Sequence, residues 1–240
     1  MSELDNSMTA LPWQIEALRF TFLQTTGSQA EQEFCWSSIT SAQPESVTSK
    51  PNLGLITEEG PWLQGTLSIA KQFGKIDIVY GFKPDTESIL PDAGKFSDIL
   101  SAASQIIEAT KHIGASRIGF GGVLLLPVEK AEDGYKFLKK FLPFINISDD
   151  MSEVFFQVNR RKKSATGLVI NELTKWSCIA LRKLMFSGDS VSSEPVDVHA
   201  TRLEFDINNA DHNEMLNDGS EKLLRELIER SKRISRDGAS

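Results

Sequence analysis

Two carboxylates in the C-terminal half have the spacing of paired catalytic or metal-binding acids. Glu204 and Asp206 stand at i and i+2 in the alternating segment Leu203 to Ile207. Because successive strand side chains point to opposite faces, the two carboxylates share one face and could hold a metal ion or divide acid and base roles. A strand whose outer face is simply solvated has the same pattern. We favour this second interpretation, which also applies to Asp77.

The densest basic run is Arg160, Arg161, Lys162 and Lys163. We expect it at a hairpin turn, where it could contact phosphates, or could keep the turn soluble and protect a sheet edge. The second role is favoured. If the chain binds nucleic acid, we expect these four cations to bind it, and only weakly at physiological salt.

Other common signatures of chemistry are absent from the sequence. The glycines of Gly119 to Gly122 precede four apolar residues rather than a helix, which argues against a dinucleotide-binding loop. The chain has no Gly-Lys-Ser/Thr, Gly-x-Ser-x-Gly or His-Glu-x-x-His motif. His112, His199 and His212 lack the spacing of zinc ligands. The sequence therefore predicts no cofactor and no metal site, and it assigns no catalytic residue.

The stretch Ser116 to Leu126 is the most apolar in the chain, and it predicts a central strand covered on both faces and ended by Pro127. Its glycines indicate a bulge or a close backbone approach. Helices are expected on either side, over Gly94 to His112 and over Val128 to Leu142.

Alternation and turn residues predict the remaining elements. Strands are expected at 14–23, 53–56, 63–70, 75–82, 154–158, 168–170, 176–186 and 196–207. The segments 41–51, 84–91 and 188–195 are expected to be loops. Capping-box spacing at Ser28 to Glu31 and at Asp211 to Glu214 predicts a short helix and a C-terminal helix that frays after Ser235.

The two halves of the chain share an order of elements: strand, short helix, three or four antiparallel strands, long helix. A local match supports a duplication, because Gly54 to Trp62 resembles Gly167 to Trp176. We expect an α+β fold of two pseudo-repeated β-α-β(3-4)-α halves, with antiparallel sheets covered on one face by helices. The expected divisions are a flexible arm at 1–13, a first half at 14–113 and a second half at 114–240. The sheets of the halves could join or pack against each other.

Composition is that of an ordinary globular protein. The 240 residues are 40% apolar and 25% charged, and no window has the length of a membrane span. The N-terminus lacks the features of a signal peptide, so the cytoplasm is expected, with Cys35 and Cys178 as reduced thiols. The net charge of −7 lies in residues 1–150, with 12 basic and 19 acidic residues, whereas residues 151–240 have 14 of each. This balance argues against broad attraction to nucleic acid or membranes.

The order of elements resembles the two halves of the TATA-box-binding-protein-like fold, over residues 14–235. The resemblance is one of topology, because no residues match those that this protein inserts into a minor groove, and the acidic first half argues against that activity. The segments Arg117-Ile-Gly-Phe120 and Leu203-Glu-Phe-Asp-Ile207 resemble a sporadically distributed bacterial family of uncharacterised proteins. That resemblance implies a bacterial origin and a mobile or defence-linked gene, and it transfers no catalytic residues.

The sequence favours a non-enzymatic binding or assembly subunit of a bacterial multiprotein complex, which holds a protein partner, or another copy of itself, on open sheet faces or strand edges. Any exposed tryptophan among Trp13, Trp36, Trp62 and Trp176 would suit an interface, although core packing is favoured for most of them. Two alternatives remain open. One is a metal-dependent hydrolase or nuclease that uses Glu204 and Asp206, and the other is a weak nucleic-acid-binding accessory protein.

Overall fold

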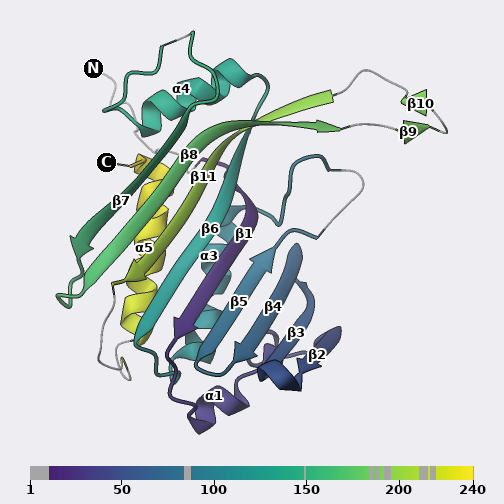
Figure 1. Ribbon diagram of the computed structural model, residues 1–240, viewed down its shortest axis with the longest axis vertical. Helices are drawn as coiled ribbons and strands as arrows, with labels where there is room; N and C mark the ends of the chain where they lie inside the picture. Colours follow the sequence, from purple (N-terminus) through teal and green to yellow (C-terminus); the bar gives the residue numbers. More distant parts are fainter. Residues whose placement is uncertain are drawn as a thin grey trace, which may run out of the picture.

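The computed structural model describes residues 11–83, 88–148, 150–183, 186–187, 190–191, 196–210, 216 and 220–239. Its main element is one nine-stranded antiparallel sheet in the order β2-β3-β4-β5-β1-β6-β11-β8-β7 (Figure 1). The strands are β1 (Gln14–Leu23), β2 (Ser46–Lys50), β3 (Leu55–Trp62), β4 (Gly65–Gln72), β5 (Lys75–Gly81), β6 (Arg117–Val128), β7 (Phe155–Lys163), β8 (Val169–Lys183) and β11 (Val196–Asn209). A small second sheet pairs β9 (Phe186–Ser187) with β10 (Ser190–Val191). The α+β class is therefore as expected.

The predicted central strand, β6, joins the two halves into one continuous sheet. It pairs with β1 on one side and with β11 on the other. Phe20 of β1 stacks on Phe120 of β6 with 4.6 Å between the ring centroids. From this central pair, β5, β4, β3 and β2 extend to one side and β11, β8 and β7 to the other.

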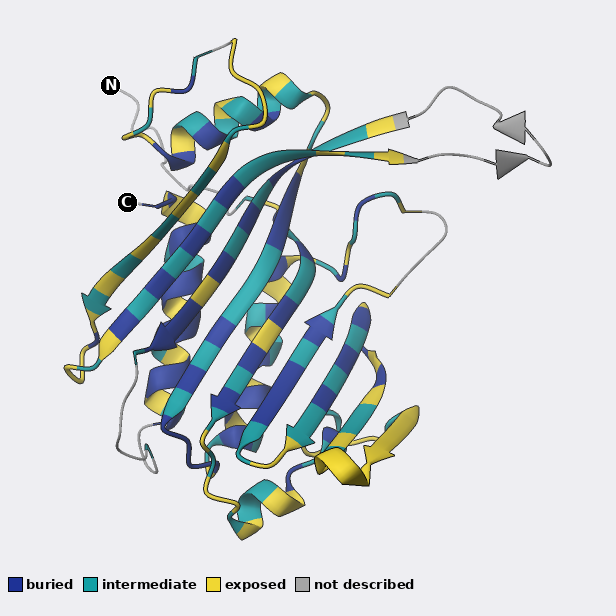
Figure 2. Cartoon of the chain, in the orientation of Figure 1, coloured by how far each residue is buried: buried dark blue, intermediate teal, exposed yellow. Residues whose placement is uncertain are grey.

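The helices over residues 96–110 and 220–237 lie behind the sheet in the view of Figure 1, and the helix over residues 131–141 lies at its upper end. The helices are α1 (Gln29–Glu33), α2 (Trp36–Thr40), α3 (Phe96–Thr110), α4 (Ala131–Phe141) and α5 (Ser220–Asp237), and η1 (Pro51–Leu53) is a 3-10 turn. α5 packs on β6 and β11, α4 on β8 and β11, and α2 on β3. We call this side the covered face and the other side the open face. Along the central strands, buried residues alternate with more exposed ones, as Figure 2 shows.

Cover on both faces of β6 was expected, and it is found only toward the end of the strand, where Leu124 and Leu125 point to opposite faces and are both fully buried. Before that point the prediction is wrong. Ile118 and Phe120 are buried on the covered face, but Gly119, Gly121 and Val123 line a hollow on the open face. The apolar composition of the segment hid this difference, because a glycine lies on an exposed strand face as easily as on a buried one.

Trp13 connects the two ends of the chain. Its Nε1 donates a hydrogen bond of 2.8 Å to the Ser235 carbonyl, 222 residues away. Its ring centroid lies 5.6 Å from that of Phe141 and 6.4 Å from that of Trp176. All four tryptophans are buried, so they pack in the core and none is an exposed interface anchor.

Several predicted boundaries in the first half and at β6 differ from the structure. The segment 41–51 contains β2, whose five residues are all exposed and therefore show no apolar alternation. The helix after Ser28 is two short helices, α1 and α2. Pro127 does not end β6, which continues to Val128. The neighbouring strand β1 begins at Gln14, which lies opposite Leu125 of β6. Beyond that point β6 has a neighbour on one side only, where a proline is tolerated.

In the second half, the two strands expected at 168–170 and 176–186 form the single strand β8. The C-terminus does not fray after Ser235. α5 continues to Asp237, and the Ala239 N–H donates a hydrogen bond of 3.1 Å to the Phe141 carbonyl. The capping box expected at 211–214 lies outside the described residues.

The two segments that suggested a local repeat lie on strands at different distances from the centre of the sheet. The segment 54–62 contains β3, which is the fourth strand of its half when β1 is counted as the first. The segment 167–176 leads into β8, which is the third strand of its half when β6 is counted as the first. This local match therefore does not mark corresponding positions, and the order of elements has to carry the argument for a repeat.

Candidate binding site on the open face of the sheet

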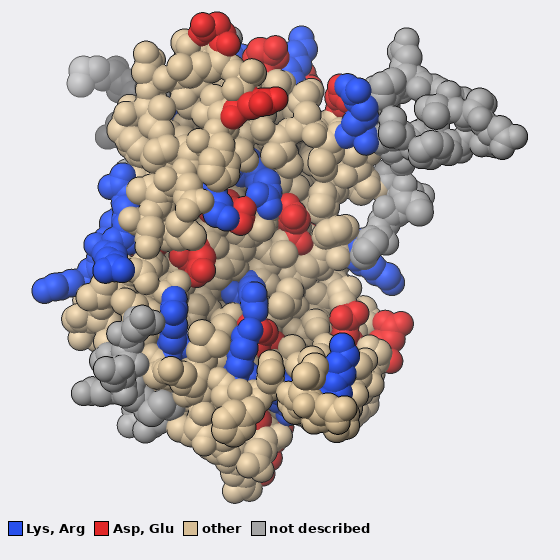
Figure 3. Space-filling view, in the orientation of Figure 1, with Lys and Arg blue, Asp and Glu red and all other residues tan. Residues whose placement is uncertain are grey.

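A hollow of about 670 Å³ lies on the open face along β6. Gly119 and Gly121 form its floor, where the absence of side chains leaves bare backbone. Thr21 of β1 and Asn208 of β11 pair with Gly119 on either side, and Arg19 and Asp206 pair with Gly121. We call this hollow the glycine trough. Figure 3 shows acidic and basic side chains interspersed around it.

Asp77 of β5 fixes the wall formed by β1. Its carboxylate accepts hydrogen bonds from Arg19 Nε at 2.9 Å, Arg19 Nη2 at 2.7 Å and Thr21 Oγ1 at 2.8 Å, and Lys75 Nζ lies at 2.8 Å. Burial alone would raise the pKa of Asp77, but the hydrogen bonds from Arg19, Lys75 and Thr21 outweigh it and hold the pKa below its usual value. Asp77 was expected to be solvated, which is wrong, since its side chain is 12% exposed. Half of the Arg19 side chain remains exposed.

Asn208 organises the opposite wall. Its Nδ2 donates to Asp206 Oδ1 at 2.8 Å, and its Oδ1 accepts from Asn171 Nδ2 and Arg117 Nη2, each at 3.1 Å. These contacts link β6, β11 and β8 across the open face. The wall therefore presents an amide and a carboxylate in fixed positions.

Glu204 and Asp206 share the open face, as their spacing predicted, but Glu204 already has cationic partners. Lys175 Nζ lies 3.0 Å and Arg202 Nη1 2.8 Å from its carboxylate. Although burial opposes them, these hydrogen bonds lower the pKa of Glu204. Among the described residues, no three His, Cys, Asp or Glu side chains are grouped so that they could hold a metal ion. His212 lies outside those residues.

The basic run lies within β7 rather than at a turn, so this part of the prediction is wrong. Its side chains alternate between the two faces. Arg160 is placed over the Phe144 ring, 5.5 Å from the centroid, and Lys162 Nζ lies 3.1 Å from a Glu172 oxygen. Arg161 and Lys163 are exposed on the other face. The four cations therefore do not form one cluster.

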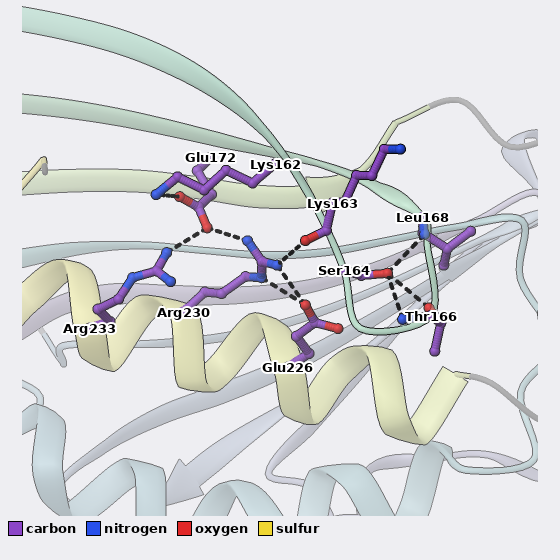
Figure 4. A network of polar contacts seen from close by, with 9 residues as sticks. All are labelled: Lys162, Lys163, Ser164, Thr166, Leu168, Glu172, Glu226, Arg230 and Arg233. Atoms are coloured by element: carbon purple, nitrogen blue, oxygen red, sulfur yellow. Dashed lines mark hydrogen bonds and ion pairs between the residues drawn. The ribbon is translucent and has the colours of Figure 1, made fainter.

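Glu172 anchors the charged network in which Lys162 takes part (Figure 4). Its Oε1 lies 2.5 Å from Arg230 Nη1 and 2.7 Å from Arg233 Nη2, both on α5. Arg230 also donates to the Lys163 carbonyl at 3.0 Å and to Glu226 at 2.6 Å. This network holds α5 against β7 and β8. We assign it a structural role, since each acidic group in it is paired with a basic group of the same network.

The glycine motif of β6 behaves as expected at one position. A Cβ at Gly122, which lies on the covered face, would be 2.5 Å from Leu18 Cδ2 and 2.9 Å from Phe205 Cζ, so the close approach is confirmed. The bulge lies on β1 instead, between Ile15 and Ala17. Cys35 and Cys178 are free thiols, as predicted.

Sequence reasoning did not identify the trough, although its parts were visible. Arg19 and Thr21 lie on the polar side of an alternating strand, and the glycine spacing of β6 is plain in the sequence. The sequence does not show the register of β1, β6 and β11, which places Arg19 and Thr21 opposite Asp206 and Asn208 across the glycines of β6.

No protein-family model, curated protein or solved structure matches the chain. None of the helices within the described residues has the length and apolar character needed to cross a bilayer.

Proposed function

We propose that this protein is a non-enzymatic binding subunit that holds an extended segment of a protein partner in the glycine trough. The observation that carries the proposal is the bare backbone floor at Gly119 and Gly121 between two walls of fixed polar side chains. A volume of about 670 Å³ is also within the range of ligand sites, roughly 300–1,000 Å³.

The walls suit a polypeptide backbone. A chain lying along β6 would direct its N–H and C=O groups sideways, toward β1 and β11. Asp206 can accept from N–H groups on one side, while Arg19 can donate to carbonyls on the other. From Arg117 to Val123, β6 extends for roughly 20 Å, enough for about six residues of an extended guest.

The charges favour a protein over nucleic acid. Around the trough, the cations Arg19, Lys75 and Arg117 are opposed by Asp77, Glu204 and Asp206, which leaves no net charge among these six residues. Phosphate backbones require several uncompensated cations. Phe205 is the one aromatic residue that lines the trough, and its side chain is buried, so no ring is offered for base stacking.

Binding is favoured over catalysis because the carboxylates of the open face have partners. Glu204 is held by Lys175 and Arg202, and Asp77 by Arg19 and Lys75. A carboxylate with a lowered pKa and two cationic partners is a weak general base. The site therefore offers positioned charge rather than a reactive group.

We also propose that the two halves arose by duplication of a β-α-β(3-4)-α unit, in a topology similar to the TATA-box-binding-protein-like fold. The strand order supports this, since β5 and β4 extend from β1 as β11 and β8 extend from β6. The resemblance to a bacterial family of uncharacterised proteins further suggests a subunit of a bacterial, defence-linked complex. In this proposal the trough lies at the junction of the two repeats.

Affinity capture from the producing cells, with wild type and Gly119→Val compared, tests the trough. A Cβ at Gly119 would meet Asn208 Cβ at 3.5 Å, an ordinary contact, so the variant should fold while its side chain fills the floor. We expect wild type to recover a defined protein in stoichiometric amount and Gly119→Val to lose it. A photo-crosslinking residue at Val123 should label that same protein.

Recovery of the same protein by Gly119→Val at wild-type yield would place the interface elsewhere. A turnover signal in a broad hydrolase screen that is abolished by Glu204→Ala or Asp206→Ala would instead show an enzyme and overturn the proposal. Lys222→Glu, a charge change on an exposed residue of α5, is the control for nonspecific effects on capture.

A further inference from the structure

The outermost strand of the N-terminal half, β2, is an open edge. In the described part of the chain β2 pairs with β3 alone, and all five of its residues are exposed. Val47 of β2 is 62% exposed and Ile56 of β3 is 41% exposed. A strand edge with unpaired backbone groups and exposed apolar side chains is a template for another strand.

The charges at this edge are arranged with opposite signs at its two ends. Lys50 is the last residue of β2, and Glu45 directly precedes its first residue, Ser46. Glu59 of β3 pairs with Ser46. All three side chains are exposed, and none of them has an ion-pair partner within the described residues. Beside the acidic end lies a hollow of about 500 Å³ lined by Glu45, Ser46 and Glu59 together with Lys83, so that two acids and one cation border it.

We propose that β2 pairs antiparallel with β2 of a second copy of this chain, about a two-fold axis at Thr48. This register is the one that pairs all five residues of both strands. It places each Lys50 opposite Ser46 of the other copy, next to Glu59 and the hollow. An antiparallel pairing of a strand with a cation at one end and anions at the other is self-complementary, which selects a second copy over an unrelated strand.

The face of β2 that carries Val47 and Ser49, opposite to that of Ser46, Thr48 and Lys50, is also self-complementary. Val47 and Ser49 share a side of β2, and Ile56 lies across from Ser49 on β3. In the proposed register Val47 faces Ser49 of the second copy, and the two Val47 side chains become diagonal neighbours. The small serine leaves room for Val47 to approach Ile56 of the second copy. The exposed apolar residues of this edge are thereby gathered at the interface.

Five paired residues make a small interface, below the roughly 1,200 Å² that stable complexes bury. The dimer is therefore weak and concentration-dependent, with a Kd on the order of 100 μM. Sedimentation equilibrium over a wide range of protein concentration is the appropriate measurement. A chain that remains monomeric up to about 1 mM would overturn the proposal.

Charge-swap variants test the register. Lys50→Glu places like charges at both symmetric contacts and should weaken the dimer about tenfold or more, and Glu59→Lys should do the same. The double variant Lys50→Glu with Glu59→Lys should recover wild-type affinity to within about threefold. Lys222→Glu is the matched control and should leave the dimer unchanged. Failure of the double variant to recover, or no loss from Lys50→Glu, would contradict the register.

A cysteine on the two-fold axis gives a second readout. Thr48→Cys should form an intermolecular disulfide rapidly under mild oxidation, because position 48 faces itself across the axis. Asn52→Cys, on the exposed 3-10 turn after β2, is off the axis and should cross-link slowly. Equal rates for the two variants would show random collision. Neither substitution lies in the glycine trough, so the partner proposal stands or fails separately.

Discussion

Glu172 of β8 and Arg230 of α5 form a buried ion pair with 2.5 Å between Oε1 and Nη1. The side chains are 4% and 10% exposed, respectively. Arg233 and Lys162 bind the same carboxylate, so one acid holds three cations from α5 and β7. The charged face of α5 is therefore fixed to the outer strands of the second half.

Replacing Glu172 by Gln is expected to destabilise the fold by about 3 kcal/mol or more, because it leaves buried cations with one fewer counterion. Urea denaturation followed by circular dichroism measures the loss. Glu221→Gln is the matched control on the same helix, since Glu221 makes an exposed pair with Arg225. This control should change the free energy of unfolding by less than about 0.5 kcal/mol. Equal effects of the two substitutions would contradict a structural role for the network.

Acid should unfold the protein through the same carboxylates. Arg230 and Lys162, against the opposing effect of burial, lower the pKa of Glu172, and Asp77 is shifted in the same direction. A lowered folded-state pKa stabilises the protein above the ordinary carboxylate value near pH 4, and this contribution is lost as the pH falls through the folded value. The free energy of unfolding should therefore be level from about pH 7 to 5 and fall below about pH 4.

The Glu172→Gln variant separates the contribution of Glu172 to this pH dependence from that of Asp77. Its free energy of unfolding should fall less steeply below pH 4 than that of wild type, because one of the shifted acids has been removed. Parallel curves for wild type and variant would show that Glu172 does not titrate with unfolding.

Two glycines three positions apart should respond in opposite ways to valine. Gly119→Val places a β-branched residue on the open face at an ordinary contact distance, so the stability should be unchanged or higher by up to about 1 kcal/mol. Gly122→Val would collide with Leu18 and Phe205 on the covered face and should cost about 3 kcal/mol or prevent folding. Thermal unfolding of both variants checks this, and similar melting temperatures would contradict the assignment of faces.

Nucleic-acid binding through the basic run should be weaker than four clustered cations would give. Because Lys162 is engaged by Glu172 and Arg160 is placed over Phe144, Arg161 and Lys163 are the exposed pair on the other face. Single-stranded DNA should show a salt slope of about −1.4, and little binding at about 0.15 M salt. In a filter-binding titration, Arg161→Ala with Lys163→Ala should remove as much binding as alanine at all four positions. Tight binding that survives both changes would identify a different surface.

Elements with their own periodicity could be predicted from the sequence. Alternation of Leu18, Phe20 and Phe22 gave β1 its observed bounds, and the apolar face of 94–112 predicted α3. β2 could not be found, because a fully exposed strand has no apolar pattern. β7 was shortened in the prediction because four successive cations resemble a turn until Glu172 and α5 supply their partners.

The candidate site required more than local pattern. Glu204 and Asp206 were placed on one face correctly, since this follows from strand geometry alone. Their neighbours across β6, Arg19 and Thr21, come from the other end of the chain, and no spacing in the sequence sets that register. The trough is thus a property of the pairing of β1 with β6.

The contacts of Trp13 constrain when its part of the core can be completed during synthesis. The aromatic rings that surround it, Phe141 and Trp176, and its hydrogen-bond acceptor, Ser235, all belong to the second half of the chain. A nascent chain that ends before α5 has no native acceptor for this indole, and until β6 emerges β1 can pair on one side only, with β5. The core around Trp13 can therefore be completed only after α5 has left the ribosome, and we expect this long-range packing to be a slow step of folding.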